Sequence, residues 1–230
     1  MIGFGACISG MLLQRMDYSG KFFPDMQPLN VFVVALIAML VCAAFGTVTG
    51  FFIAYLNVPP FIATLAMMEI VYGIGLIVTN ATPLGGYVEQ YTNVSNGKFL
   101  GINYLIWIAI IVAAITWFIF NMTRHGKYMY AIGGNPQAAE VAGVPVKATL
   151  ILIYMKAAAM YGLAGFMLGA KAGGASVQTG YGYEMEAIAA CTIGGVSVTG
   201  GRGKVSSAII GVAVFELLKV ALQYLGMNAN

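Results

Sequence analysis

The sequence predicts an all-α protein: a polytopic bundle of transmembrane helices, with a short cytoplasmic helix and a half-helix near the C-terminal third. Of its 230 residues, 60% are hydrophobic and only 8% are charged, whereas an average soluble domain has about 25% charged residues. Polar residues are too few to cover a surface that faces water, so lipid must cover much of it. Long apolar runs form the helices, and no period-2 alternation indicates a β-barrel.

Apolar runs give the helices in chain order. A helix that crosses a bilayer needs roughly 20 apolar residues. The sequence predicts full spans at 31–56, 61–78, 102–120, 148–169 and 205–225. Residues 1–13 form a partial span. Residues 187–198 are apolar but short, so we interpret them as a half-helix or re-entrant segment whose ends are buried by protein.

Polar or proline-bearing stretches separate these runs. Residues 14–30 mix both charge signs with glycine and proline, which is typical of a loop. Pro59 and Pro60 end the helix before them. Residues 79–101 are interpreted as an aqueous loop, and residues 171–186 as a flexible polar segment.

Small residues recur at four-residue spacing in three places, which lets neighbouring helices approach closely. Gly46 and Gly50 form one such pair in the span 31–56. The other two sets are Gly165, Gly169 and Gly173, and Gly203, Ser207 and Gly211. Residues four apart lie on one face of a helix, so we expect each set to form a helix–helix seam.

The longest soluble interruption is the loop 123–147, and its charge predicts the side on which it lies. Arg124, Lys127 and Lys147 bracket it, and Glu140 is its only acid. Because short cytoplasmic loops carry an excess of Lys and Arg, we expect this loop in the cytoplasm of a multi-pass membrane protein.

Alternation of spans then assigns the other loops. It places 79–101 outside, and 14–30 outside despite Arg15 and Lys21, with the turn at 57–60 inside. The side of 199–204 stays open. It is cytoplasmic if 187–198 crosses the membrane, and external if that segment dips and returns.

A short helix is expected within the central loop. Asn135 is a predicted N-cap and Pro136 stands at the first helical position. Gly143 is expected to end the helix, and Gly133 and Gly134 to supply a sharp bend before it. A helix between two spans can carry motion from a soluble partner into the bundle, and the alternative interpretation is an ordinary connecting loop.

Three motifs carry a resemblance to a known family. The loop TRHGKYMYAIGGNPQAAEVAGVPV is similar to the cytoplasmic loop of bacterial ABC sugar importer permeases of the ribose, galactose and xylose type. GYGYEMEAIAACTIGGVSVTGGRGKV, residues 180–205, and AYLNVPPFIATLAMM resemble two further motifs of that family, with Glu186 where the family usually has Asp. Among the subtypes of the family, the sequence of these motifs most resembles the galactose and methyl-galactoside subtype.

The resemblance implies a function and partners. It implies a multi-pass subunit of the bacterial inner membrane that forms the translocation path for a galactose-like monosaccharide delivered by a periplasmic binding protein. It also implies two cytoplasmic ATPase subunits and a second permease copy, as a homodimer or with a close homologue. The positions implied to couple to the ATPase are Arg124, Gly126, Gly133, Gly134, Asn135, Pro136, Ala138, Ala139 and Gly143.

The resemblance also bears on the extent of the chain. The family's first helices, its Asp-Leu-Ser-x-Gly segment and its last helix have no counterpart in these 230 residues. We therefore expect a single permease domain that is truncated at both ends. The alternative is a short natural protein with a tilted or interfacial first helix.

The sequence gives no support for catalysis by this chain. No Gly-x-x-x-x-Gly-Lys-Ser/Thr phosphate loop is present, so ATP hydrolysis is expected in a separate subunit. His125 is the only histidine, and we expect neither catalytic residues nor a metal or cofactor site. The net charge of +3 is small and gives little support for nucleic-acid binding.

Polar residues within apolar runs are candidates for the transport pathway, because they are costly in lipid. Glu69 is the candidate of this kind. Further candidates, in the polar segment 171–186, supply amide, aromatic and carboxylate groups of the types found in sugar sites: Gln178, Tyr181, Tyr183, Glu184 and Glu186. Glu184 and Glu186 are equally consistent with stabilising a helix N-terminus, and Glu216 with Lys219 is expected to pair on one helix face. Two other functions stay open: a stand-alone ion-coupled carrier or channel that uses Glu69, or a fragment without transport function.

Overall fold

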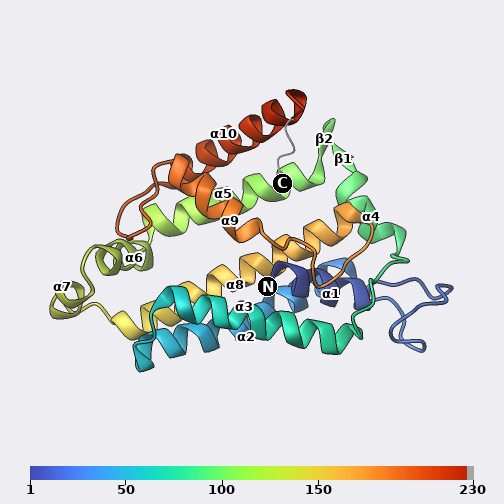
Figure 1. Ribbon diagram of the computed structural model, residues 1–230, viewed down its shortest axis with the longest axis horizontal. Coiled ribbons are helices and arrows are strands. Elements are labelled where there is room, and N and C mark those ends of the chain that lie inside the picture. The colour runs from blue at the N-terminus through green and yellow to red at the C-terminus, as the bar shows by residue number, and fades with distance from the viewer. Residues whose placement is uncertain (227–230) are drawn as a thin grey trace. The chain divides into compact units, whose positions relative to one another are not determined.

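The computed structural model describes residues 1–226, and these are mostly helical (Figure 1). The helices are α1 (Ile2–Leu12), α2 (Val31–Leu56), α3 (Pro60–Thr79), α4 (Glu89–Asn96), α5 (Tyr104–Met122), α6 (Arg124–Gly134), α7 (Pro136–Val141), α8 (Val146–Ala172), α9 (Tyr183–Ile193) and α10 (Val205–Tyr224). Within the described part, α2, α3, α5, α8 and α10 are long and apolar enough to cross a membrane. The predicted fold class is confirmed.

The chain divides into two compact units. The first unit contains residues Met1–Ala109 and Lys147–Tyr181. The second contains Ile110–Val146 and the chain from Gly182 onward.

Local sequence explains where the helices of the first unit begin and end. The Asn30 side chain accepts a hydrogen bond of 2.9 Å from the Phe32 amide and caps α2. Asn57 ends α2 in the left-handed conformation, with φ of 52°. Pro60 then occupies the first turn of α3, where its missing N–H costs nothing. The predicted break at the two prolines is confirmed.

Glycines bring α1, α2 and α8 together in the first unit. A Cβ added to Gly50 of α2 would lie 2.7 Å from the Cα of Ile151 in α8, and one added to Gly46 would overlap the carbonyl of Tyr154. A Cβ on Gly165 of α8 would overlap the carbonyl of Ile2 in α1. Only residues without side chains permit these backbone contacts.

One member of the expected α8 seam lies outside the helix. The helix ends at Ala172, and Gly173 follows it with φ of +66° and nothing within 4 Å of an added Cβ. Gly169 does pack tightly, because its Cβ would lie 2.6 Å from the Tyr91 hydroxyl. The expectation that Gly173 extends the seam was wrong, because the four-residue spacing continues past the helix end.

The loops 14–30 and 79–101 form one structure at the same end of the first unit. Gln14 and Tyr87 form an antiparallel bridge, and the Val88 amide donates to the Leu13 carbonyl at 2.9 Å. The contact agrees with the assignment of both loops to one side. We call the residues 13–30, 80–103 and 173–177 the loop cap, since Leu84 also bridges to Ala175.

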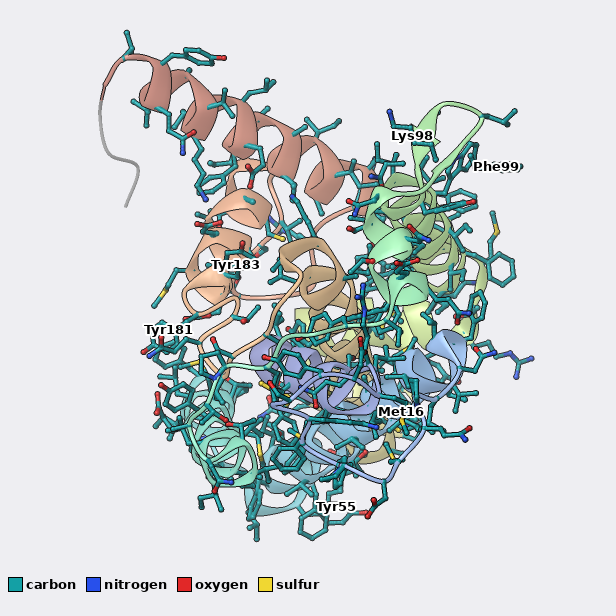
Figure 2. All side chains as sticks on the ribbon, turned by 90° about the vertical axis from the view of Figure 1, so that its right-hand side faces the viewer. Met16, Tyr55, Lys98, Phe99, Tyr181 and Tyr183 are labelled. Atoms are coloured by element: carbon teal, nitrogen blue, oxygen red, sulfur yellow. The ribbon has the colours of Figure 1, made fainter. Side chains whose placement is uncertain are left out.

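The loop cap contains regular structure that the sequence interpretation missed. Residues 79–101 hold helix α4 and a hairpin of β1 (Lys98–Phe99) and β2 (Ile102–Asn103). Figure 2 shows Lys98 and Phe99 at this hairpin. Tyr91 of α4 is fully buried, and its hydroxyl donates to the Phe166 carbonyl of α8 at 2.7 Å. Burial raises the pKa of Tyr91 and of Tyr87.

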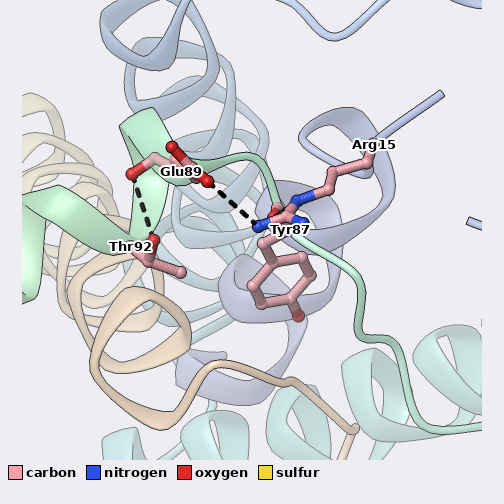
Figure 3. A network of polar contacts seen from close by, with 4 residues as sticks. All are labelled: Arg15, Tyr87, Glu89 and Thr92. Carbon is pink, nitrogen blue, oxygen red and sulfur yellow. Dashed lines mark hydrogen bonds and ion pairs between the residues drawn. The ribbon is translucent and has the colours of Figure 1, made fainter. Parts of the chain in front are cut away.

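Arg15 is held within the loop cap (Figure 3). Its Nε donates to the Tyr87 carbonyl at 2.8 Å, and its Nη2 lies 3.9 Å from Oε1 of Glu89. Lys21 donates to the carbonyls of Pro24 and Met26 in its own loop. Arg15 and Lys21 are basic residues on the side that is predicted to be external. Both have hydrogen-bond partners within the loop cap.

The opposite end of the first unit joins α2 to the start of α8. The Lys147 ammonium lies 5.1 Å from the centroid of the Tyr55 ring, within the range of a cation–π interaction. The turn at 57–60 and the end of the central loop thus lie at the same end of the unit, as alternation of spans predicts.

In the second unit, α9 and α10 pack as an antiparallel pair. A Cβ on Gly194 would overlap the Ser207 carbonyl, and one on Gly211 would overlap the Ala190 carbonyl. Ser207 and Gly211 therefore lie in the contact, whereas Gly203 precedes α10 with φ of +145°. The short helix also begins and ends earlier than the predicted 187–198.

Candidate functional site

The polar loop between α5 and α8 contains two helices, the first of which the sequence interpretation missed. Thr123 caps α6: its Oγ1 accepts the Gly126 amide at 3.2 Å and donates to the Ile119 carbonyl at 2.6 Å. A Cβ on Gly126 would overlap the carbonyls of Ile119 and Phe120. Glycine at this position therefore lets α6 fold tightly against the end of α5.

Asn135 alone joins α6 to α7. Its amide donates to the Ala131 carbonyl at 3.0 Å and ends α6, and its Oδ1 accepts the Ala138 amide at 3.0 Å and caps α7. Pro136 fills the first position of α7. The predicted N-cap is confirmed. The expected bend at Gly133 and Gly134 was wrong, because both residues belong to α6 and the chain turns at Asn135.

Gly143 ends the second helix in the predicted way. It has φ of +83°, where side-chain-bearing residues are strained. Its amide donates to the Glu140 carbonyl at 2.9 Å, and the Val144 amide donates to the Ala139 carbonyl at 3.0 Å. These two bonds form a Schellman motif. Both ends of α7 are therefore held by hydrogen bonds to the backbone.

The residues implied to couple to the ATPase divide by exposure. Arg124, Gly134, Asn135, Pro136, Ala138 and Gly143 are exposed, whereas Gly126 and Ala139 are buried and Gly133 is half-buried. The two buried residues and the half-buried Gly133 shape the loop, so only the exposed six are available to a partner.

The sequence interpretation missed the most exposed apolar side chain of this surface. Val141 is 91% exposed at the end of α7. Gln137, Glu140 and Ala142 are exposed beside it. We call the exposed residues from Asn135 to Gly143 the α7 surface. The available signal was that Val141 is the one large apolar residue in the short polar segment 135–143.

The turn 199–204, whose side the sequence left open, lies beside α6. The Tyr130 hydroxyl donates to the Gly203 carbonyl at 2.7 Å. A Cβ on Gly133 would overlap the Gly201 amide nitrogen. Figure 1 shows the turn between α9 and α10 next to α6. It is therefore on the same side as the central loop.

The pathway candidates are not brought together in one unit. Glu69, Gln178 and Tyr181 belong to the first unit, and Tyr183, Glu184 and Glu186 to the second. Glu69 is exposed on α3, whose buried face is formed by Ala63, Met67, Val71, Gly75 and Thr79. Glu184 and Glu186 lie in the first turn of α9, where the helix dipole favours a carboxylate.

Glu186 has a partner that local spacing did not indicate. The Lys219 ammonium lies 2.7 Å from Glu186 Oε1 and joins α10 to α9. The expected ion pair between Glu216 and Lys219 was therefore wrong. Within residues 1–226, no group of three or more His, Cys, Asp and Glu side chains is arranged to hold a metal ion.

The chain is similar in sequence to known membrane permeases. The family model described as the permease component of branched-chain amino acid transport systems matches residues 1–230. The chain is 39% identical to the galactose/methyl galactoside import permease protein MglC of Escherichia coli K12, and 40% identical to MglC of Haemophilus influenzae; each alignment covers 99% of this chain and 70% of the relative. The ribose import permease protein RbsC of Escherichia coli K12 is 35% identical over 87% of this chain and 64% of its own length. No solved structure matches the chain.

Proposed function

We propose that this chain, which belongs to the permease-component family of branched-chain amino acid transport systems, forms the membrane pathway for a galactose-like monosaccharide. It is a multi-pass permease component of an ABC sugar importer, and its family implies an ATPase and a binding protein as partners. The permease itself is not catalytic, and its sequence has no phosphate loop.

Galactose is proposed because two galactose/methyl galactoside permeases share more residues with the chain than the ribose permease does. The two galactose/methyl galactoside permeases are 39% and 40% identical over 99% of the chain, compared with 35% over 87% for the ribose permease. In the proposed cycle, the binding protein selects the sugar and delivers it, and two copies of the permease enclose the path.

The observation that carries the proposal is the α7 surface. A helix of six residues has little stability alone, yet Asn135 and Gly143 hold both ends of α7. The helix presents Ala138 and the 91% exposed Val141 rather than burying them. A small, fixed, apolar projection on a basic loop is suited to a cleft in a soluble partner. We assign this projection to the ATPase subunit.

Reconstitution tests the function directly. The purified chain, its ATPase subunit and its binding protein are placed in proteoliposomes, and uptake of labelled galactose is measured. We expect uptake that requires ATP and the binding protein, with ribose as the comparison sugar. ATP-dependent uptake of ribose without galactose would replace the substrate and leave the importer class intact.

Glu69 supports a second candidate, an ion-coupled carrier. Its carboxylate is exposed near the middle of α3, and it belongs to neither of the ion pairs found in residues 1–226. The carrier predicts uptake by the chain alone under an ion gradient, which is lost in Glu69→Gln. The importer predicts no uptake without the ATPase in either form of the chain.

A further inference from the structure

We infer that a glycine-to-glycine contact between α6 and the turn 199–204 transmits displacement of α7 to the α9–α10 pair, which then moves as one body. This inference rests on the proposed function, because it requires α7 to be displaced by an ATPase. It assigns positioning roles to Gly133 and Tyr130, and it selects α9 and α10 as the helices that respond first.

The contact joins two backbones without side chains between them. A Cβ on Gly133 would lie 2.9 Å from the Gly201 Cα and would also overlap the Gly201 amide nitrogen. From the other side, a Cβ on Gly201 would lie 2.7 Å from the Gly134 amide nitrogen. Closely packed atoms transmit strain, and no flexible side chain is present here to absorb it.

The turn is shaped to make this approach. Gly200 and Gly201 have φ of +92° and +71°, which glycine adopts without strain. The Ser197 amide donates to the Arg202 carbonyl at 3.0 Å and closes the turn. The turn therefore presents its glycine backbone to α6 as a closed loop.

A hydrogen bond holds the same two elements together. Tyr130, three residues before Gly133 on α6, donates its hydroxyl to the Gly203 carbonyl at 2.7 Å. The Tyr130 ring packs edge-on against Phe120, with centroids 5.8 Å apart. Movement of α6 toward the turn is resisted by the glycine contact, and movement away from it by this bond.

Displacement of α7 reaches this contact over a very short distance. Asn135 is the only residue between the two helices, and its amide and side chain are hydrogen-bonded to α6 and α7, respectively. Gly133 is two residues from Asn135. Little chain is therefore available between the proposed ATPase contact and the turn.

Beyond the turn, α9 and α10 are joined along their length. The overlaps of Gly194 with Ser207 and of Gly211 with Ala190 leave no room for sliding in the half nearest the turn. The ion pair of Glu186 with Lys219 joins the half that is farther away. Because these three contacts join the two helices along their length, displacement of the turn moves both helices together.

Two helical glycines provide a matched test. Gly133→Ala places a methyl group against Gly201, whereas Gly73→Ala in α3 places one where nothing lies within 4 Å. Both glycines are helical, so the gain in helix propensity is shared. Each variant is assembled with the ATPase subunit and the binding protein in proteoliposomes, and sugar transported and ATP hydrolysed are measured on the same sample.

We expect Gly133→Ala to lower the sugar transported per ATP by about tenfold, within the roughly 5- to 150-fold range of typical couplings between sites. Gly73→Ala should keep the ratio of the unchanged chain. Loss of structure alone would reduce the amount of assembled complex but leave the ratio per assembled complex unchanged. Equal ratios for the two variants and the unchanged chain would overturn the inference.

Tyr130→Phe provides a second test of the contact between α6 and the turn, in case Gly133→Ala does not assemble. It removes only the hydroxyl that bonds to Gly203 and keeps the ring contact with Phe120. We expect a severalfold lower ratio of sugar to ATP, and an unchanged ratio would contradict the inference. Failure of the proposed function is distinguishable, because the unchanged chain would then show no ATP-dependent sugar uptake.

Discussion

The loop cap and the α7 surface are both polar interruptions of an apolar chain, but they treat their side chains in opposite ways. The loop cap buries Leu84, Tyr87 and Tyr91. Within it, Arg15 donates to the Tyr87 carbonyl and lies near the Glu89 carboxylate. The α7 surface satisfies its backbone but leaves Ala138 and Val141 exposed. One region stabilises its own unit, and the other presents a surface to a partner. Substitutions in the loop cap should therefore lower stability, and substitutions on the α7 surface should lower coupling.

The largest effect on stability is expected from Tyr91→Ala. Tyr91 is fully buried, and its hydroxyl donates to Phe166. Truncation of a buried aromatic side chain typically costs about 3–5 kcal/mol. Thermal unfolding of the purified chain should shift downward strongly. Tyr91→Phe is the control, since it removes the hydrogen bond but leaves no comparable cavity. An unchanged unfolding temperature for the alanine variant would show that α4 does not stabilise the unit.

The next effect concerns binding, and it separates the two regions most clearly. Val141→Asp introduces a charge at a side chain that is 91% exposed, and exposed substitutions usually change stability by less than about 0.5 kcal/mol. At the centre of an interface, loss of an anchor typically costs about 2 kcal/mol or more. We expect affinity for the ATPase subunit to fall about thirtyfold, with unchanged unfolding. Phe99→Asp, at an exposed residue of the loop cap, is the matched control. Equal ATPase affinities for the two variants would contradict the assignment of the α7 surface, rather than the loop cap, to the ATPase contact.

A smaller effect is expected at the N-terminus of α7. Asn135→Ala removes the acceptor for the Ala138 amide, and loss of such a cap typically costs about 1 kcal/mol. Hydrogen exchange should become faster in α7 and stay unchanged in the loop cap. Asn135→Ser retains a capping oxygen and should exchange at nearly the original rate. Protection that persists in the alanine variant would mean that the cap is not what orders α7.

The smallest effect is expected at Arg15. The side chain is half-exposed, and its distance to Glu89 is 3.9 Å. Exposed ion pairs typically contribute about 0–1 kcal/mol. Arg15→Gln should lower stability by about that amount, since it also loses the bond to the Tyr87 carbonyl. Glu89→Gln, which keeps that bond, should change stability less. The comparison is made by thermal unfolding at low and high salt, and a salt-independent loss in Glu89→Gln would contradict the assignment.

The helices that sequence reasoning predicted well are those whose limits depend on local chemistry. The spans 31–56 and 205–225 agree with α2 and α10 to within a residue, because the length of an apolar run and its flanking residues determine them. The cap at Asn135 and the stop at Gly143 are also local. The positive-inside pattern assigns the basic central loop to the cytoplasm despite Arg15, and this side stays a prediction.

The features that were missed depend on contacts between distant residues. The segment of α4 is polar, and its helix is stabilised by burial of Tyr91 against α8. Glycines at the end of α6 suggested a bend, whereas Gly133 is required by the approach of Gly201. Lys219 pairs with Glu186 rather than Glu216 because α9 packs on α10. Spacing along one helix contains no information about such partners.

The central claim is that α7 contacts the ATPase subunit, and cysteine crosslinking tests it most directly. Val141→Cys and Phe99→Cys are compared in the assembled importer, with a short bifunctional reagent and detection of the joined subunits. We predict that the cysteine at position 141 is joined to the ATPase subunit, that nucleotide changes the yield, and that the cysteine at position 99 gives no such product. Equal yields from both positions, or no product from position 141 in a complex that transports sugar, would contradict it.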